Sequence, residues 1–357
     1  MDDKDVIHNN NSISTQRELE NCTFIKTILM ITIVLYHSLV FWTGTWFIDK
    51  PIFNSQVLCY IAKWLNTFHI YTFTFVSGYL FGYIKYEKKR YSDYKKFVIN
   101  KCKRLLIPYM FASIIWVIPL GTVFFKYNTN DVFHKYILGE SPSQLWFLLM
   151  LFMVFIIYYP ISNFVMNRVT VGFLVIAGFY CIGILGSMVM PNVFMIWTAC
   201  KYMLFFHLGN MVRVNNIQII YKIPCLVYIG VDISIFIAMQ VLEQFNTCTL
   251  LFKMCELALY IVVCIVGTFM AFVVLQRIAQ SINWNKEAFI KLSEKTMVIY
   301  LFHQQVIYFT IYIFNGIVNP YINAGINFIV AITFSLIIAT ILLKYSFTRF
   351  MVGEKIV

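Results

Sequence analysis

The chain has 357 residues, of which 60% are apolar and 12% are charged, and its mean hydropathy is +0.75. A soluble domain carries about a quarter charged residues, so this composition excludes an ordinary soluble globular protein. The net charge of +12 would suit a nucleic-acid-binding protein, but the cations are distributed as in a membrane protein.

Long apolar stretches recur along the chain. A helix needs about 20 predominantly apolar residues to cross a bilayer, and it satisfies its own backbone hydrogen bonds there. We predict an all-α polytopic integral membrane protein with about ten transmembrane helices. In chain order, the predicted spans are residues 24–46, 57–84, 105–125, 145–165, 171–190, 194–212, 219–241, 249–275, 296–314 and 324–343.

The predicted organisation is a single membrane domain. We expect a polar N-terminal segment at residues 1–23, the membrane domain at 24–345 and a tail at 346–357, with both termini cytoplasmic. The first apolar stretch is too long for a cleaved signal peptide and lacks a small-residue cleavage site, so it is interpreted as a retained signal anchor. No paired Gly/Pro-broken helices of the kind found in inverted-repeat transporters are visible.

The Lys and Arg residues set the predicted orientation. With the N-terminus inside, most of the 28 cations fall on cytoplasmic segments, above all on the stretch Lys85–Arg104. This asymmetry follows the positive-inside rule, so the basic charge is expected to contact anionic lipid and not nucleic acid. The remaining cations, outside or within spans, are Lys50, Lys63, Lys126, Lys135, Lys201 and Lys253.

The nine cysteines do not indicate a metal site. No C-x-x-C pair occurs, and most of the cysteines fall within predicted spans. We expect buried free thiols and no bound metal, with a bond between Cys248 and Cys255 near the outer face as the alternative.

Ionisable side chains inside a bilayer are costly, so each one needs an explanation. For a lone histidine on an apolar helix, the usual explanation is a hydrogen bond to a neighbouring helix. The members of this set are His37, His69, Lys201, His207, Asp232, Glu256 and His303, and Asp232 or Glu256 could pair with Lys201.

The spacing of Lys26 and His37 distinguishes the first span. Eleven residues of helix place the two side chains on one face, about 16 Å apart along the axis. A cation at the cytoplasmic end with an imidazole deeper on the same face suits a long acyl carrier, whose phosphates stay at the surface while its reactive end is delivered inside. Histidine is also the side chain best suited to move a proton near neutral pH, as acylation of a sugar hydroxyl requires.

Five motifs occur in order along the chain. In the first motif, a basic residue on the first predicted helix is followed eleven positions later by histidine. The last motif has the pattern Ser…Tyr-Leu-x-His. The five motifs are RELENCTFIKTILMITIVLYHS (Arg17–Ser38), FHIYTFTFVSGYL (Phe68–Leu80), KCKRLLIPY (Lys101–Tyr109), LWFL (Leu145–Leu148) followed by Tyr159 and Pro160, and SEKTMVIYLFH (Ser293–His303).

Together these motifs resemble the bacterial membrane-bound acyltransferase-3 family, whose members acylate sugar hydroxyls, often with acetyl groups. Lys26 and Lys101 stand where that family more often has arginine, so the charge is kept but the planar fork for phosphate is lost. The resemblance implies His37 as the catalytic residue, acting as a base or accepting the acyl group itself. It implies a donor and substrate site that contains Lys26, Lys101, Arg104, His69, Trp146 and His303.

Several of these residues have a second interpretation. Lys26, Lys101 and Arg104 also fit ordinary cations at a cytoplasmic helix end, and Trp146 also fits the aromatic belt at the membrane interface. Ser77 and Gly78 are expected to allow close helix packing, because no G-x-S-x-G element accompanies the serine.

The function expected from the resemblance is O-acyl transfer, with acetyl as the first candidate, from acyl-CoA to a hydroxyl of a cell-surface polysaccharide or lipid-linked glycan. Acetyl-CoA or another acyl-CoA is then a co-substrate, no cofactor is tightly bound, and the protein is multi-pass in a bacterial plasma membrane. A separate extracytoplasmic transferase is a possible partner. The alternative is an exporter or flippase of a lipid-linked saccharide or nascent polysaccharide; a glycan polymerase would be expected to have a larger outer loop.

Overall fold

The computed structural model describes residues 3–245, 249–282, 284 and 287–354, and side chains from residue 20 onward. Cys248 of the alternative disulfide lies outside these residues. The described part is helical, with no strand. Its α-helices are α1 (Asp3–Leu39), α2 (Gln56–Asn66), α3 (His69–Gly82), α4 (Tyr94–Lys101), α5 (Ile107–Ala112), α6 (Ile118–Phe125), α7 (Thr129–Val132), α8 (Trp146–Asn167), α9 (Val169–Val189), α10 (Ile196–Val214), α11 (Cys225–Gln244), α12 (Leu250–Ser281), α13 (Glu287–Ser293), α14 (Thr296–Phe314), α15 (Pro320–Leu342) and α16 (Ser346–Met351).

Eight helical stretches of the described part are long and apolar enough to cross a membrane. The count of about ten therefore stays a prediction, because two predicted spans lie outside these eight. The span predicted at 57–84 is divided into α2 and α3 at Thr67 and Phe68. The span predicted at 194–212 corresponds to α10, whose Lys201, His207 and Asn210 lower its hydropathy.

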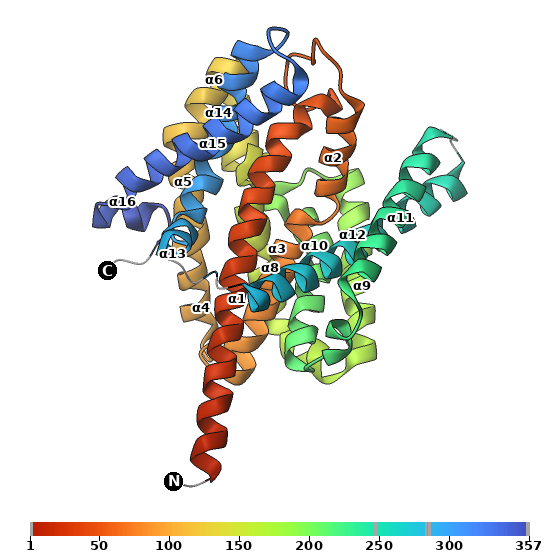
Figure 1. The fold of residues 1–357 in the computed structure, drawn as a ribbon, viewed down its shortest axis with the longest axis vertical. Helices are drawn as coiled ribbons and strands as arrows, with labels where there is room; N and C mark the ends of the chain where they lie inside the picture. Colours follow the sequence, from red (N-terminus) through yellow and green to blue (C-terminus); the bar gives the residue numbers. More distant parts are fainter. Residues whose placement is uncertain (1–2, 246–248, 283, 285–286, 355–357) are drawn as a thin grey trace.

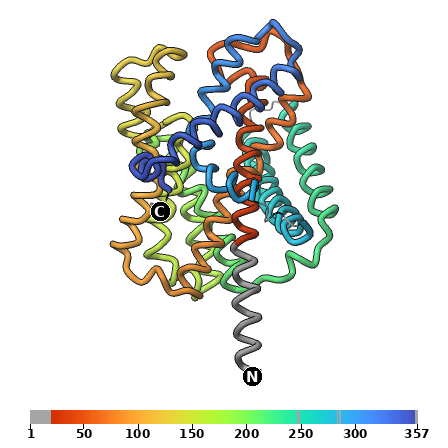
Figure 2. The backbone as a smooth tube through the Cα atoms, turned by 60° about the vertical axis from the view of Figure 1, so that its left-hand side comes forward, coloured from red at the N-terminus to blue at the C-terminus, as the bar shows by residue number. Residues whose placement is uncertain are grey.

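Helix α1 runs along the long axis through the middle of the molecule (Figures 1 and 2). It packs against α2, α3, α12, α14 and α15, so both early and late parts of the chain surround it. Ile25, Ile33 and Val34 are almost completely buried in these contacts. The first predicted span thus lies at the centre of the helical bundle and not at its periphery.

Helices α3 and α10 cross in very close contact through two glycines. A Cβ atom on Gly78 would lie 1.9 Å from the carbonyl oxygen of Phe206, and one on Gly209 would lie 1.9 Å from that of Phe75. Since the obstructing atoms are backbone, no larger residue fits without separating the helices. The prediction that Gly78 allows close packing is confirmed.

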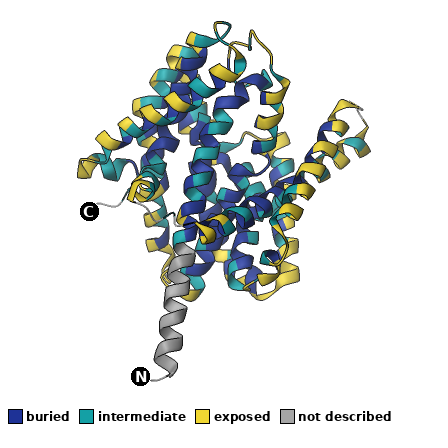
Figure 3. Ribbon diagram, viewed as in Figure 1, coloured by how far each residue is buried: buried dark blue, intermediate teal, exposed yellow. Residues whose placement is uncertain are grey.

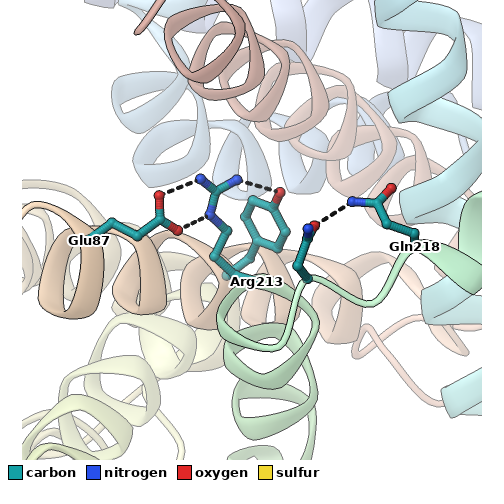
Figure 4. Close-up of polar contacts among 5 residues, drawn as sticks. Glu87, Arg213 and Gln218 are labelled. Carbon is teal, nitrogen blue, oxygen red and sulfur yellow. Dashed lines mark hydrogen bonds and ion pairs between the residues drawn. The ribbon is translucent and has the colours of Figure 1, made fainter. Parts of the chain in front are cut away.

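The end of α10 is fixed by Arg213. Its Nε lies 2.5 Å from Glu87 Oε1 and its Nη2 lies 2.7 Å from Oε2, which gives a bidentate ion pair, while its Nη1 donates to the Tyr79 hydroxyl (Figure 4). This clamp joins α10 to α3 and to the turn that follows α3.

The stretch Tyr94–Phe125 is one long helix with two wider π-helical turns, at Cys102–Leu106 and Ser113–Val117. Each turn is followed at once by a helix with proline near its first residue, Pro108 in α5 and Pro119 in α6. Proline lacks an N–H and clashes with the carbonyl four residues earlier, so a wider turn accommodates it inside the helix. The first of these turns contains Arg104.

Exposed residues are frequent on α9, on α11, on the first turns of α12 and on α15 (Figure 3). Many of them are large and apolar: Leu226 is 80% exposed and Leu250 is 76% exposed. A surface of this composition is stable against lipid but not against water. Most of the polar side chains discussed below are buried or half-buried within the bundle.

Candidate functional site

Helix α1 connects two cavities. Lys26 lines a cavity of about 260 Å³, here called the cationic cavity, and His37 lines a second one of about 410 Å³, here called the histidine cavity. Ile33 lines both cavities, and residues 26, 33 and 37 follow the seven-plus-four spacing of one helix face. Phe147 of α8 and Tyr300 of α14 complete the wall that the two cavities share.

His37 and His303 are in direct contact. The Nε2 atom of His303 lies 3.1 Å from Nδ1 of His37. The Nδ1 atom of His303 lies 3.0 Å from the carbonyl oxygen of Ile299 and 2.9 Å from that of Tyr300. His303 is completely buried and does not line the cavity, so it stands behind His37 and not beside it.

These contacts determine which ring nitrogens of the neutral histidines carry hydrogen. A carbonyl oxygen can only accept, so Nδ1 of His303 is the donor and its Nε2 is the acceptor. The Nδ1 atom of His37, which is also 3.0 Å from the Ile33 carbonyl, must then carry the hydrogen. The Nε2 atom of His37 is left as the acceptor, which is the form that a general base needs.

His69 and Trp146 also line the histidine cavity. The His69 ring packs on Tyr36 with a centroid distance of 4.6 Å, and its Nδ1 atom lies 2.6 Å from the Leu65 carbonyl oxygen. Its Nε2 is therefore also an acceptor in the neutral ring. Trp146 forms part of this cavity wall, and its place in the interfacial aromatic belt stays a prediction.

Lys26, Lys101 and Arg104 come together at the cationic cavity from two separate stretches of chain. The Lys101 ammonium lies 3.5 Å above the Phe155 ring, and that of Lys26 lies 5.7 Å from the Phe73 ring. No carboxylate of the described residues forms an ion pair with any of the three cations. Arg104 is exposed, but Lys26 and Lys101 are only partly exposed, and such cations without an acidic partner are costly unless an anion binds between them.

A third cavity, of about 520 Å³, continues from the cationic cavity and is here called the mouth cavity. Lys101 and Arg104 line both, as do Gly353 and Glu354 near the C-terminal end of the chain. The three cavities therefore follow one another in order: the mouth cavity, the cationic cavity and the histidine cavity.

The sequence analysis missed a polar network on the wall of the histidine cavity. Gln144 Nε2 donates to Gln305 Oε1 at 2.7 Å and to the Leu301 carbonyl at 2.9 Å, while Gln304 Nε2 donates to Ser143 Oγ at 3.0 Å. The Tyr300 hydroxyl donates to the Gln144 carbonyl. The sequence does contain a signal for this network. Two adjacent glutamines directly after His303, inside an apolar span, need hydrogen-bond partners.

The other ionisable candidates lie away from the site. Trp64 Nε1 donates to Asp232 Oδ2 at 2.8 Å, and neither Asp232 nor Glu256 forms an ion pair with Lys201 in the described part of the chain. Tyr158 shares a 2.7 Å hydrogen bond with His207, as expected for an interhelical histidine. Among the described residues, no three His, Cys, Asp or Glu side chains gather as a metal-binding set.

Comparison with known protein families gives a match. A family model described as an acyltransferase domain, that of the acyltransferase-3 family, matches residues 21–344. No curated protein and no solved structure gives a match. The match covers nearly the whole chain and includes every lining residue of the histidine cavity, and those of the other two cavities except Phe350, Gly353 and Glu354. The chain therefore belongs to the acyltransferase-3 family and is a multi-pass membrane acyltransferase.

Proposed function

We propose that the protein transfers an acyl group, acetyl first, from acyl-CoA to a hydroxyl of a cell-surface polysaccharide or lipid-linked glycan in a bacterial plasma membrane. The observation that carries this proposal is the meeting of two chemically different cavities at the face of α1 that holds His37. One cavity suits an anionic carrier and the other suits a hydroxyl-rich acceptor.

The donor side of the proposal rests on the cationic cavity. Lys26, Lys101 and Arg104 bind the phosphates of acyl-CoA, and the positive-inside rule predicts that the mouth cavity opens to the cytoplasm, where acyl-CoA is present. The long arm of the carrier then passes the shared wall and brings the thioester to His37. Holding the two reactants in this way supplies a large part of the rate enhancement.

The chemistry rests on the Nε2 atom of His37. It takes the proton from the acceptor hydroxyl as that oxygen attacks the thioester carbonyl carbon. The carbon–sulfur bond breaks, the sulfur leaves as a thiolate, and His37 returns the proton to it, so that the products are an ester and free CoA. Transfer of the acyl group onto His37 itself is the other route open to the same atom.

His303 acts in this proposal as a positioning residue. It touches neither cavity, and it accepts the Nδ1 hydrogen of His37 at 3.1 Å. This bond keeps the His37 ring in one orientation and favours the tautomer with a free Nε2.

Export of a saccharide along the same route is the second candidate, because the three cavities lie in series. A sugar ring is wider than the carrier arm of acyl-CoA, so Ile33, Phe147 and Tyr300, each at most 7% exposed, would have to separate further for a sugar to pass than for the arm.

The proposal is tested in membranes that contain the protein and in membranes from the same cells without it. Acetyl-CoA labelled in the acetyl group is added, and the surface glycan is isolated and examined by mass spectrometry. We expect labelled O-acetyl groups on the glycan only when the protein is present. An unlabelled glycan with an unchanged mass in both preparations would disprove the proposal and leave export as the function to test.

A further inference from the structure

Lys135 is the one permanently charged side chain among the described residues that line the histidine cavity. It belongs to the helical turn Phe133–Ile137, on the segment that connects α6 to α8. Its ammonium lies 4.0 Å from the centre of the Tyr127 ring, and no carboxylate of the described part forms an ion pair with it. Among the described residues, the histidine cavity therefore has one cationic side chain, and no carboxylate pairs with it.

The segment that bears Lys135 is held in place by hydrogen bonds to two of the residues that follow this lysine. The Tyr109 hydroxyl donates to the backbone carbonyl of Tyr136 at 2.7 Å, and the Phe194 N–H donates to that of Leu138 at 2.7 Å. Lys135 is only partly exposed, whereas Lys126, earlier on the same segment, is exposed. Lys135 is thus a fixed part of the cavity wall and not a freely moving surface lysine.

The remaining wall suits a saccharide. Trp46, Trp146 and Tyr202 present aromatic rings, on which the apolar faces of sugar rings can pack. Gln304 also lines the cavity, and its buried Oε1 atom has no partner in the described part, so it is ready to accept from a hydroxyl. A hydroxyl-rich ligand satisfies these groups, but it leaves the charge of Lys135 unpaired.

We propose that the acceptor is an anionic saccharide and that Lys135 pairs with its negative group. This inference rests on the proposed function, because it assigns the histidine cavity to the acceptor. The negative group is a carboxylate on a sugar or a phosphate on the saccharide or its lipid carrier. Either one would form a charge-assisted hydrogen bond with Lys135.

The test uses the glycan that the cell itself makes, freed of O-acyl groups by mild base. The intact glycan is compared with a sample whose carboxyl groups have been reduced to alcohols and with one whose phosphates have been removed. Transfer from labelled acetyl-CoA is measured with purified wild-type protein and with Lys135→Gln, Lys135→Arg and the matched control Lys126→Gln.

With wild-type protein, we expect neutralising the relevant group to lower kcat/KM about tenfold, the usual size for one charge-assisted contact. The treatment that lowers it identifies the group as carboxylate or phosphate. In Lys135→Gln the ratio between intact and neutralised glycan falls to about one, while Lys135→Arg and Lys126→Gln keep it.

A native acceptor without carboxylate or phosphate would overturn the inference. Equal transfer to intact and neutralised glycan by wild-type protein would overturn it as well, and so would an unchanged ratio in Lys135→Gln. Each of these results leaves acyl transfer itself intact. If wild-type protein transfers nothing to any of the three samples, the proposed function fails, and the inference fails with it.

Discussion

The cationic cavity and the histidine cavity lie end to end along one face of α1, yet their walls differ. Lys26, Lys101 and Arg104 bring three positive charges to the first, among mainly apolar neighbours. The second has aromatic rings and a network of amides and hydroxyls. Two reactants of different chemistry can therefore be selected independently and still meet at the wall that both cavities share.

The largest effect on acyl transfer is expected for a substitution of His37, where the two cavities meet. His37→Ala removes the proposed base, so kcat for acyl transfer should fall by about 10²–10⁴-fold, the usual contribution of general base catalysis. Binding of acyl-CoA should change little, because the cations stay in place. The measurement is transfer of labelled acetyl to glycan by protein inserted at normal levels.

His134→Ala is the matched control, since His134 is exposed and lies outside the cavities. If His37→Ala transfers acetyl at the wild-type rate, His37 is not the catalytic residue. The two cavities would then meet at a residue without a chemical role.

The next effect tests whether His303 positions His37. His303→Ala removes the acceptor for the Nδ1 hydrogen, so kcat should fall about tenfold to a hundredfold, with an unchanged KM for acyl-CoA. His303→Gln can offer an amide oxygen to the same hydrogen and should restore part of the rate. If kcat falls equally in the alanine and glutamine variants, His303 contributes to packing and does not position His37.

A smaller effect separates the donor side from the acceptor side. Lys101→Gln or Arg104→Gln should raise the KM for acyl-CoA about tenfold and leave the KM for glycan unchanged, since each removes one contact to phosphate. Lys95→Gln is the control, because Lys95 is exposed on α4 and lines no cavity. Equal changes in both KM values would mean that the cavities do not select their reactants separately.

The smallest effect concerns the identity of one cation. Lys26→Arg introduces a planar guanidinium that can bind phosphate with two hydrogen bonds, and it should lower the KM for acyl-CoA about threefold. A rise in KM would show that the compact ammonium, lying 5.7 Å from the Phe73 ring, fits the cavity better than a guanidinium does.

The helical fold could be predicted from the sequence, since repeated apolar stretches leave few other structures in a bilayer. The positions of Lys26 and His37 on one face also followed, because helix geometry fixes relations within a single element. The division of residues 57–84 at Thr67 and Phe68 did not follow, because apolar composition continues across the break. The π-helical turns before Pro108 and Pro119 were missed for a related reason, since hydropathy does not record backbone geometry.

Relations between distant elements could be anticipated only in part. The family motifs predicted that His37, His303 and Trp146 belong to one site, but their contacts depend on how α1, α8 and α14 pack. The sequence gives no sign that His303 stands behind His37 and not in the cavity. Lys135 was counted as one of the few cations outside the cytoplasmic segments, and only the fold of residues 126–144 brings it to the cavity wall.

The central claim is that donor and acceptor reach His37 from opposite ends of one route. The most direct measurement uses sealed inside-out membrane vesicles with de-O-acylated glycan trapped in the lumen and labelled acetyl-CoA added outside, with His37→Ala vesicles as the control. The account predicts label on the trapped glycan in wild-type vesicles and none in the control. Label that appears only when glycan is added on the same side as acetyl-CoA would contradict the account.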